Sequence, residues 1–144
     1  MLLAEMATRA ELKKLAYLRL KEADALYRAE LYDGVAYLCG YCIEFALKAR
    51  ICKVLGVSEY PDAGRLRQAY AVHDLSQLLL LAGLQPKVGP ANAELFKNWS
   101  IAAEWRPERR YDPPGTFTRQ MAHDLLEAIR SRRNGVLTWL VKRW

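Results

Sequence analysis

The sequence lacks the long apolar runs and leader segments that mark membrane and secreted proteins. A membrane-spanning helix needs about 18 or more consecutive apolar residues. The longest clean apolar run here covers only residues 78–83. Residues 1–14 carry acids where a secretory signal carries bases, and they contain no apolar core of signal length. We therefore expect a cytoplasmic protein with no membrane segment.

Cysteine and histidine are too few for a metal centre or a disulfide framework. The three cysteines, Cys39, Cys42 and Cys52, fall within one predicted helix, and the chain has only two histidines. A structural zinc site takes its ligands from two such pairs, and Cys39-x-x-Cys42 has no second CxxC or histidine pair nearby. We expect all three cysteines to pack in the core, and we expect no metal or other cofactor.

Signatures of the common nucleotide-binding and hydrolytic folds are also absent. The sequence contains no GxGxxG, no GxxxxGKS/T, and no strand on which either loop could be built. It shows no sustained alternation of apolar and polar residues, and no Asn-Gly or Asp-Gly between two β-branched runs. No Ser/His/Asp or Cys/His constellation is visible from the spacing.

Helical periodicity is strong in several blocks of the chain. A chain of 144 residues with 52% apolar content is near the usual size for one hydrophobic core. We expect residues 1–144 to form a single all-α domain, an antiparallel bundle of about five helices.

The first two predicted helices are long and cover residues 8–30 and 34–55, with a turn at residues 31–34. Thr8 and Glu11 form a capping box at the start of the first helix. The second helix is nearly apolar all round and should be central. The core faces comprise Leu12, Ala16, Leu20, Ala23, Tyr27 and Leu31 in the first helix, and Val35, Leu38, Cys39, Cys42, Ala46 and Leu47 in the second.

Shorter helices are expected after residue 64. A basic segment at residues 65–69 precedes a helix that opens at residues 73–75 and ends near Leu81, with Gly83 as C-cap. Another helix covers residues 92–104. Prolines prevent residues 105–115 from being helical throughout.

The last predicted helix starts at Thr116. Asn134-Gly135 should weaken or bend it, because glycine costs about 1 kcal/mol relative to alanine in a helix interior. Its inward residues are Met121, Leu125, Ile129, Val136 and Leu140.

In the second helix, Ala36 and Gly40 are small enough to let another backbone approach closely.

Three segments carry a family resemblance. Residues 32–49 read YDGVAYLCGYCIEFALKA, residues 73–79 read HDLSQLL, and residues 105–111 read WRPERRY. In this order they are similar to the helix that opens with YD and continues GYxxExALKA, the HDLxxLL helix, and the WxPxxRY loop of the HEPN family. HEPN stands for "higher eukaryotes and prokaryotes nucleotide-binding", and the members are helical bundles.

The resemblance implies a bundle that is usually a homodimer and, in bacteria, is often encoded beside a minimal nucleotidyltransferase. Some members are metal-independent RNases, in which four to six residues separate an arginine and a histidine on the last helix. Others lack that motif and are nucleotide-binding or partner-binding modules. A neighbouring nucleotidyltransferase would favour a toxin–antitoxin type pair.

Arg119 and His123 are the candidate catalytic pair, although only three residues separate them. Their spacing still places both side chains on one helix face. Arg119 would stabilise a phosphate, and His123 would transfer a proton during attack by a ribose hydroxyl. Glu127 and Arg130 continue that face, so a solvated stripe is the interpretation that the spacing favours.

Glu44 and Lys48 stand one turn apart on an otherwise apolar helix. An unpaired buried charge is prohibitively costly. The structural interpretation, which we favour, pairs Glu44 with Lys48 or with an arginine of residues 105–111. In the functional interpretation both line a nucleotide pocket. His73 either belongs to the N-cap region of its helix or faces that pocket as a proton donor.

Residues 105–111 contain the densest group of candidate binding residues. Guanidinium groups bind phosphate through two hydrogen bonds, and aromatic rings offer a stacking surface to bases. In the alternative, the aromatic residues hold the segment on the bundle while its arginines pair with Glu44, Glu104 or Glu108. The predicted nucleotide-binding residues are Glu44, Lys48, His73, Trp105, Arg106, Arg109, Arg110 and Tyr111.

The net charge of +6 is concentrated in residues 104–144, which hold nine Lys/Arg and five Asp/Glu. This balance is compatible with a polyanionic partner, although charge runs usually form solvated faces. Our preferred hypothesis is a homodimeric HEPN-like module that binds a nucleotide, RNA or a partner nucleotidyltransferase. The alternative is a metal-independent RNase that uses Arg119 and His123.

Overall fold

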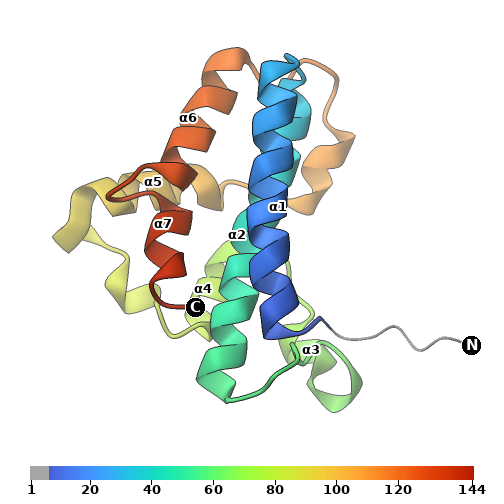
Figure 1. Ribbon diagram of the computed structural model, residues 1–144, viewed down its shortest axis with the longest axis vertical. Helices are drawn as coiled ribbons and strands as arrows, with labels where there is room; N and C mark the ends of the chain where they lie inside the picture. The colour runs from blue at the N-terminus through green and yellow to red at the C-terminus, as the bar shows by residue number, and fades with distance from the viewer. Residues whose placement is uncertain (1–6) are drawn as a thin grey trace, which may run out of the picture.

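Two long antiparallel helices, α1 (Arg9–Arg28) and α2 (Tyr32–Leu55), run along the computed structural model, which describes residues 7–144. They pack against each other along the long axis of the molecule (Figure 1). The Thr8 hydroxyl accepts the Glu11 N–H over 3.1 Å, and the Glu11 carboxylate accepts the Thr8 N–H over 2.7 Å. The predicted capping box is therefore confirmed.

The remaining helices are shorter, and most of them contact α2. They are α3 (Arg67–Tyr70), α4 (Leu75–Leu81), α5 (Ala93–Ala103), α6 (Arg119–Arg130) and α7 (Val136–Val141), with 3-10 turns η1 (Gly64–Leu66), η2 (Gln85–Lys87), η3 (Pro90–Asn92) and η4 (Pro107–Tyr111). Residues 7–144 contain no β-strand, only an isolated bridge between Thr8 and Glu59. The all-α prediction is confirmed. None of the helices within these residues is long and apolar enough to cross a membrane.

α2 lies at the centre of the core, as its apolar surface predicts. Buried residues from α1, α4, α5, α6 and α7 join those of α2 in one hydrophobic cluster. Cys39, Cys42 and Cys52 are free and buried, so the prediction that they pack in the core is confirmed. Burial raises the pKa of the Cys39 thiol to about 12. The thiol therefore stays protonated near neutral pH, which suppresses its reactivity.

The chain reverses at residues 29–31, earlier than the predicted turn at residues 31–34. Glu30 adopts a left-handed φ of 62°, and the Leu31 N–H donates to the Leu26 carbonyl over 2.9 Å. Leu31 is 57% exposed, so its assignment to a core face is wrong. Asp33-Gly34 has the composition of a turn, but the first turn of α2 also accommodates an acid well.

The predicted last helix is in fact two helices, because the chain leaves helical geometry between Arg130 and Val136. Ser131 and Gly135 have extended ψ values of 137° and 139°. A Cβ on Gly135 would lie 2.5 Å from the Ser131 nitrogen and 2.6 Å from the Ile129 carbonyl oxygen. Position 135 therefore requires glycine, because its backbone lies close to that of residues 129–131. The helix that we predicted to be weakened or bent here is in fact interrupted.

Asn134 fixes this corner to α5. Its side-chain oxygen accepts from Asn92 over 3.1 Å, and its carbonyl accepts from Asn98 over 2.9 Å. Its amide donates to the Glu94 carboxylate over 2.5 Å. These bonds replace part of the helical hydrogen bonding that the break removes.

α6 begins after the N-cap Thr118, not at Thr116. The Thr118 hydroxyl accepts the Met121 N–H over 3.2 Å. Met121 itself is 41% exposed, so its prediction as a core residue is wrong. The other predicted inward residues of this region are buried, namely Leu125, Ile129, Val136 and Leu140.

Gly40 contacts the indole ring of Trp105, whereas we predicted that it contacts the backbone of another segment. A Cβ at this position would lie 2.0 Å from atoms of the Trp105 ring. Trp105 is consequently only 4% exposed. This contact places the segment that follows α5 against the middle of α2.

Candidate functional site

The segment that follows α5 is anchored at its start by Trp105. The indole packs on Gly40 and meets the Tyr41 ring edge to face, with centroids 5.0 Å apart and an angle of 68° between the planes. The five residues of η4 follow directly. The buried ring thus fixes where the arginines of this segment leave the surface of the bundle.

Asp33 holds the far end of the same segment. Its carboxylate oxygens accept the N–H groups of Gly115, over 2.7 Å, and Phe117, over 2.8 Å. Asp33 lies in the first turn of α2, and Gly40 lies two turns further along. Residues 105–117 therefore bridge one side of α2 and are held at both ends.

Three arginines leave this segment without acidic partners. Among residues 7–144, no carboxylate lies within 4.0 Å of Arg106, Arg109 or Arg110. We predicted as an alternative that these arginines pair with Glu44, Glu104 or Glu108, and none of these pairs forms. Unpaired guanidinium groups held on a fixed backbone are suited to binding an anion.

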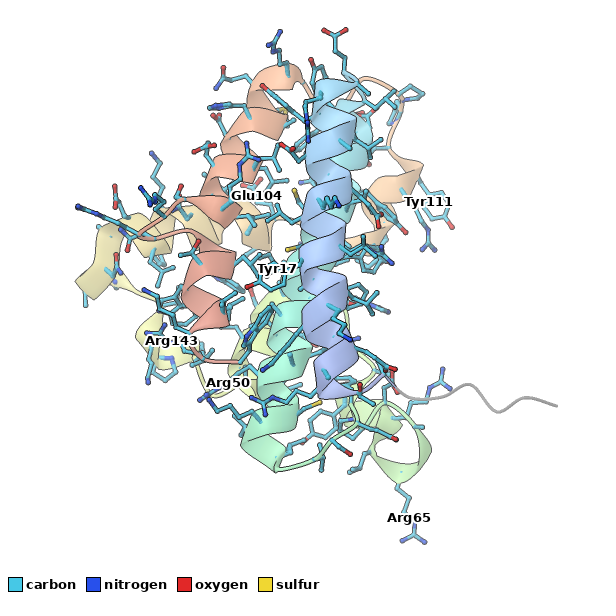
Figure 2. All side chains as sticks on the ribbon, viewed as in Figure 1. Tyr17, Arg50, Arg65, Glu104, Tyr111 and Arg143 are labelled. Atoms are coloured by element: carbon cyan, nitrogen blue, oxygen red, sulfur yellow. The ribbon has the colours of Figure 1, made fainter. Side chains whose placement is uncertain are left out.

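Tyr111 and Arg110 form an exposed aromatic and cationic pair. The Arg110 guanidinium lies 4.8 Å from the centroid of the Tyr111 ring, and Tyr111 is 76% exposed. Figure 2 shows Tyr111 projecting outward on the side of the molecule away from Arg143. The Tyr111 and Tyr37 hydroxyl groups raise the pKa of Arg110 further, although an arginine is charged at all physiological pH values without such help.

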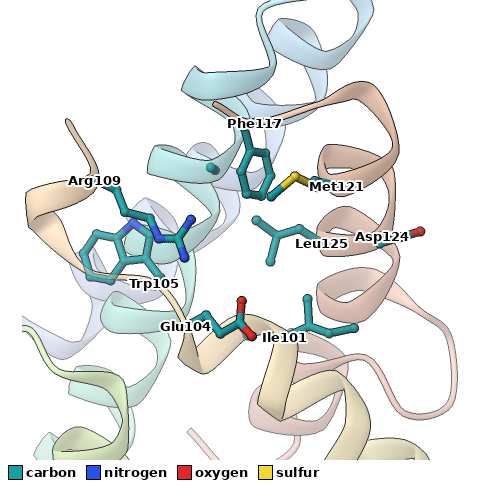
Figure 3. A pocket seen from close by; sticks show the side chains of 10 residues that line it. Ile101, Glu104, Trp105, Arg109, Phe117, Met121, Asp124 and Leu125 are labelled. Atoms are coloured by element: carbon teal, nitrogen blue, oxygen red, sulfur yellow. The ribbon is translucent and has the colours of Figure 1, made fainter. Parts of the chain in front are cut away.

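An apolar cavity of about 170 Å³ lies between α2, α5, α6 and this segment (Figure 3). Its walls include Ala36, Ile101, Ala102, Trp105, Phe117, Met121 and Leu125. Glu104, Arg109 and Asp124 supply polar groups to it. We call it the apolar cavity.

A second hollow, of about 260 Å³, is also lined by Arg109. We call it the arginine cavity, because both Arg109 and Arg110 line it. Its other walls are Asp33, Gly34, Ala36, Tyr37, Asp112, Thr116 and Phe117. Arg109, Ala36 and Phe117 belong to both cavities, so the two adjoin.

A third hollow, of about 440 Å³, brings His73 and Arg106 to one place. We call it the His73 cavity. Trp105 and Arg106 form one wall with Pro107 and Glu108, and Val72, His73, Asp74 and Gln77 form the other. Asp74 is the N-cap of α4, with its carboxylate accepting the Gln77 N–H over 2.9 Å. His73 thus precedes the cap residue and also lines a cavity, whereas its role as a proton donor in a nucleotide pocket stays a prediction.

Glu44 is a buried carboxylate behind His73. One oxygen lies 2.7 Å from the His73 Nδ1, and the other lies 3.4 Å from the Lys48 Nζ. Glu44 is 1% exposed and Lys48 is 7% exposed. The predicted ion pair within α2 is confirmed, and no arginine of residues 105–111 joins it. Lys48 also lies 4.9 Å from the centroid of the Tyr60 ring, which further compensates its buried charge.

Arg119 and His123 share one face of α6, as predicted, and both lie beside Tyr27 of α1. The Tyr27 hydroxyl raises the pKa of Arg119, and the His123 ring centroid is 6.5 Å from that of Tyr27. The stripe continues with Arg130, which binds Asp24 over 2.8 Å. Neither Arg119 nor His123 lines the three cavities described above. The two groups of predicted site residues are therefore separate.

Asp33 and Gly40 position this site, although neither was predicted from the sequence to do so. Both belong to residues 32–49, the segment that carries the first part of the family resemblance. An acidic residue in the first turn of an apolar helix is normally explained by the helix dipole alone. The hydrogen bonds that Asp33 accepts from Gly115 and Phe117 join residues more than 80 positions apart, and no local sequence pattern predicts them.

Comparison with known proteins agrees with this architecture. The model of one family, described as HEPN domain, matches residues 10–143. No curated protein and no solved structure matches the chain. The family match extends from the first turn of α1 to beyond the last residue of α7. Over nearly its whole length, this chain therefore belongs to the HEPN domain family.

Proposed function

We propose that this HEPN protein is a binding module for a phosphate-containing ligand, a nucleotide or a segment of single-stranded RNA. The observation that carries the proposal is the set of arginines at 106, 109 and 110, which emerge from a doubly anchored segment with no carboxylate within 4.0 Å among residues 7–144. Arginine binds phosphate in a bidentate fashion, and the arginine cavity gives the phosphate a place beside Arg109 and Arg110.

The aromatic residues of the segment have different roles in this proposal. Tyr111 is exposed, so its ring is available to stack on a base, and stacking of this kind is tolerant of sequence. Trp105 is buried and anchors the segment. Tyr37, on α2, lines the arginine cavity beside Arg110. Charge and stacking thus occur together on one surface.

Arg106 and His73 offer a second polar contact in the His73 cavity. The Glu44 carboxylate at 2.7 Å orients the His73 ring, and Lys48 holds Glu44 in turn. Glu44 and Lys48 are buried, so in this proposal they position His73 and do not touch the ligand. A homodimer, a nucleotidyltransferase partner, a toxin–antitoxin type pair and a cytoplasmic location stay predictions from the sequence.

Replacing both Arg109 and Arg110 with alanine should weaken RNA binding by about a hundredfold or more, because each charge-assisted hydrogen bond is worth about 1.5–3 kcal/mol and about 1.4 kcal/mol corresponds to a factor of ten. The slope of log K against log salt should also fall by about 1.4, the value for two lost phosphate contacts on a single strand. Fluorescence anisotropy with a labelled single-stranded oligonucleotide, at several salt concentrations, measures both quantities.

Arg132→Ala/Arg133→Ala is the matched control for this experiment. It removes the same charge from an exposed pair outside the three cavities. Equal losses in the two variants would mean that binding follows net charge alone. Unchanged binding by folded Arg109→Ala/Arg110→Ala would exclude this surface as the phosphate site.

The alternative function is a metal-independent RNase that uses Arg119 and His123. The observation in its favour is that both side chains are accessible on one face of α6 beside Tyr27. On the binding-module proposal, wild-type protein incubated with a mixed RNA pool and EDTA leaves the RNA intact. Cleavage by the wild type that disappears in His123→Ala would establish the RNase and contradict our preference.

A further inference from the structure

We infer that the apolar cavity accepts the single ring of a pyrimidine base, so that the protein prefers pyrimidine over purine nucleotides. The inference rests on the proposed function, because the base would belong to the same ligand whose phosphate binds Arg109 and Arg110. It adds a specificity that phosphate binding alone does not provide. Three observations support it.

The first observation is the size and lining of the cavity. An apolar protein cavity of about 150 Å³ holds one benzene molecule, and the cavity here has about 170 Å³. The cavity is open on one side, so one six-membered ring fits within the apolar walls, whereas the second ring of a purine would extend out of them. Phe117, Met121 and Leu125 offer apolar contacts to such a ring (Figure 3).

The second observation is a buried hydrogen-bond donor without an acceptor. The indole Nε1 of Trp105 has no partner among residues 7–144, although the residue is only 4% exposed. A buried N–H in this state is uncommon, since native proteins satisfy most of their buried polar groups. Both cytosine and uracil carry a carbonyl oxygen next to a ring nitrogen, and such an oxygen would accept this N–H.

The third observation is that Arg109 connects this donor with the phosphate site. Arg109 lines both the apolar cavity and the arginine cavity. Figure 3 shows Arg109 and the Trp105 indole on the same side of the cavity, which both residues line. In this proposal, movement of the Arg109 side chain toward a phosphate gives a base carbonyl access to the Trp105 N–H. Glu104 and Asp124, at the same cavity, would accept the N–H groups of the base.

The test is a titration with the four nucleoside 5′-monophosphates, followed by ¹H–¹⁵N NMR. The chain has four tryptophans, so the indole region contains few resonances, and Trp105→Phe identifies the one from residue 105. We expect UMP and CMP to shift this resonance and to bind about tenfold or more tightly than AMP and GMP. The purine nucleotides should bind through phosphate and, because their bases stay outside the apolar cavity, should shift the Trp105 resonance less than UMP and CMP do.

Two variants separate the base site from the phosphate site. Met121→Phe should fill the mouth of the apolar cavity and abolish the pyrimidine preference while AMP binding is retained. Leu80→Phe, at a position 64% exposed on α4, is the matched control and should keep the preference. Equal affinities for all four nucleotides would overturn the base site and leave the proposed function intact. Absence of binding by every nucleotide and by RNA would overturn the proposed function, and the base site with it.

Discussion

Gly40→Ala is expected to destabilise the protein by about 3 kcal/mol or more, an unusually large effect for the addition of one methyl group. The added Cβ would lie 2.0–2.1 Å from three atoms of the Trp105 ring, and the alanine methyl group has no rotamer that avoids this clash. Either α2 shifts within a tightly packed core, or the indole leaves its place. Both outcomes remove buried apolar contacts.

Urea unfolding followed by circular dichroism measures the stability, and Gly89→Ala is the matched control. A Cβ on Gly89 would have no atom within 4 Å, and its φ of −173° is extended backbone that alanine adopts readily. The control should therefore change the free energy of unfolding by less than about 0.5 kcal/mol. If Gly40→Ala matched the control, Trp105 would not pack on α2 as described here.

The same variant connects stability with binding. If Trp105 is expelled while the helices remain folded, the backbone of residues 105–111 loses its anchor on α2. RNA binding should then weaken although Arg109 and Arg110 are unchanged, because preorganised groups bind more tightly than mobile ones. Gly89→Ala should keep wild-type affinity.

Glu44→Leu is expected to destabilise the protein by about 3–5 kcal/mol, the usual cost of removing one partner from a buried ion pair. Lys48 is 7% exposed and its Nζ lies 3.4 Å from the Glu44 carboxylate. Without that carboxylate the buried ammonium group keeps the Tyr60 ring as a neighbour but has no ion-pair partner among residues 7–144. His73 also loses the acceptor of its Nδ1.

Two further variants make this second prediction specific. Glu22→Leu removes the acid of an ion pair with Arg19 whose side chains are 27% and 39% exposed, so it should cost no more than about 1 kcal/mol. The double variant Glu44→Leu/Lys48→Met should recover most of the lost stability, because replacing both charges with apolar groups is often neutral. A double variant less stable than Glu44→Leu would show that the pair does not account for the loss.

Several features of the fold could be predicted from short stretches of sequence. The capping box of Thr8 and Glu11 places the start of α1 correctly, since both groups are three residues apart and act within one turn. The ion pair of Glu44 and Lys48 follows from helical spacing in the same way. The end of α4 near Gly83 was also predictable, and that glycine has a left-handed φ of 71°.

The predictions that failed concern competition between local and distant contacts. Asp33-Gly34 resembles a turn, yet Asp33 lies in α2 and binds Gly115 and Phe117, far along the chain. Met121 has the helical spacing of a core residue, but it lies at the edge of a cavity and is 41% exposed. Neither outcome is visible in a window of one or two helical turns.

By itself, the sequence determined the helical class of the protein, its family and the presence of an arginine-rich segment with aromatic residues. These properties depend on periodicity, capping and the order of motifs, and each of these can be recognised within short stretches of the sequence. Only the tertiary structure decided that Trp105 is buried on Gly40 and that His73 contacts Glu44. It also decided that, within residues 7–144, the Trp105 N–H has no acceptor and Arg109 and Arg110 have no acidic partner. The physical reason is that burial and charge pairing depend on which distant segments pack together. That packing depends on the contacts of all the core residues, not on any one short stretch of sequence.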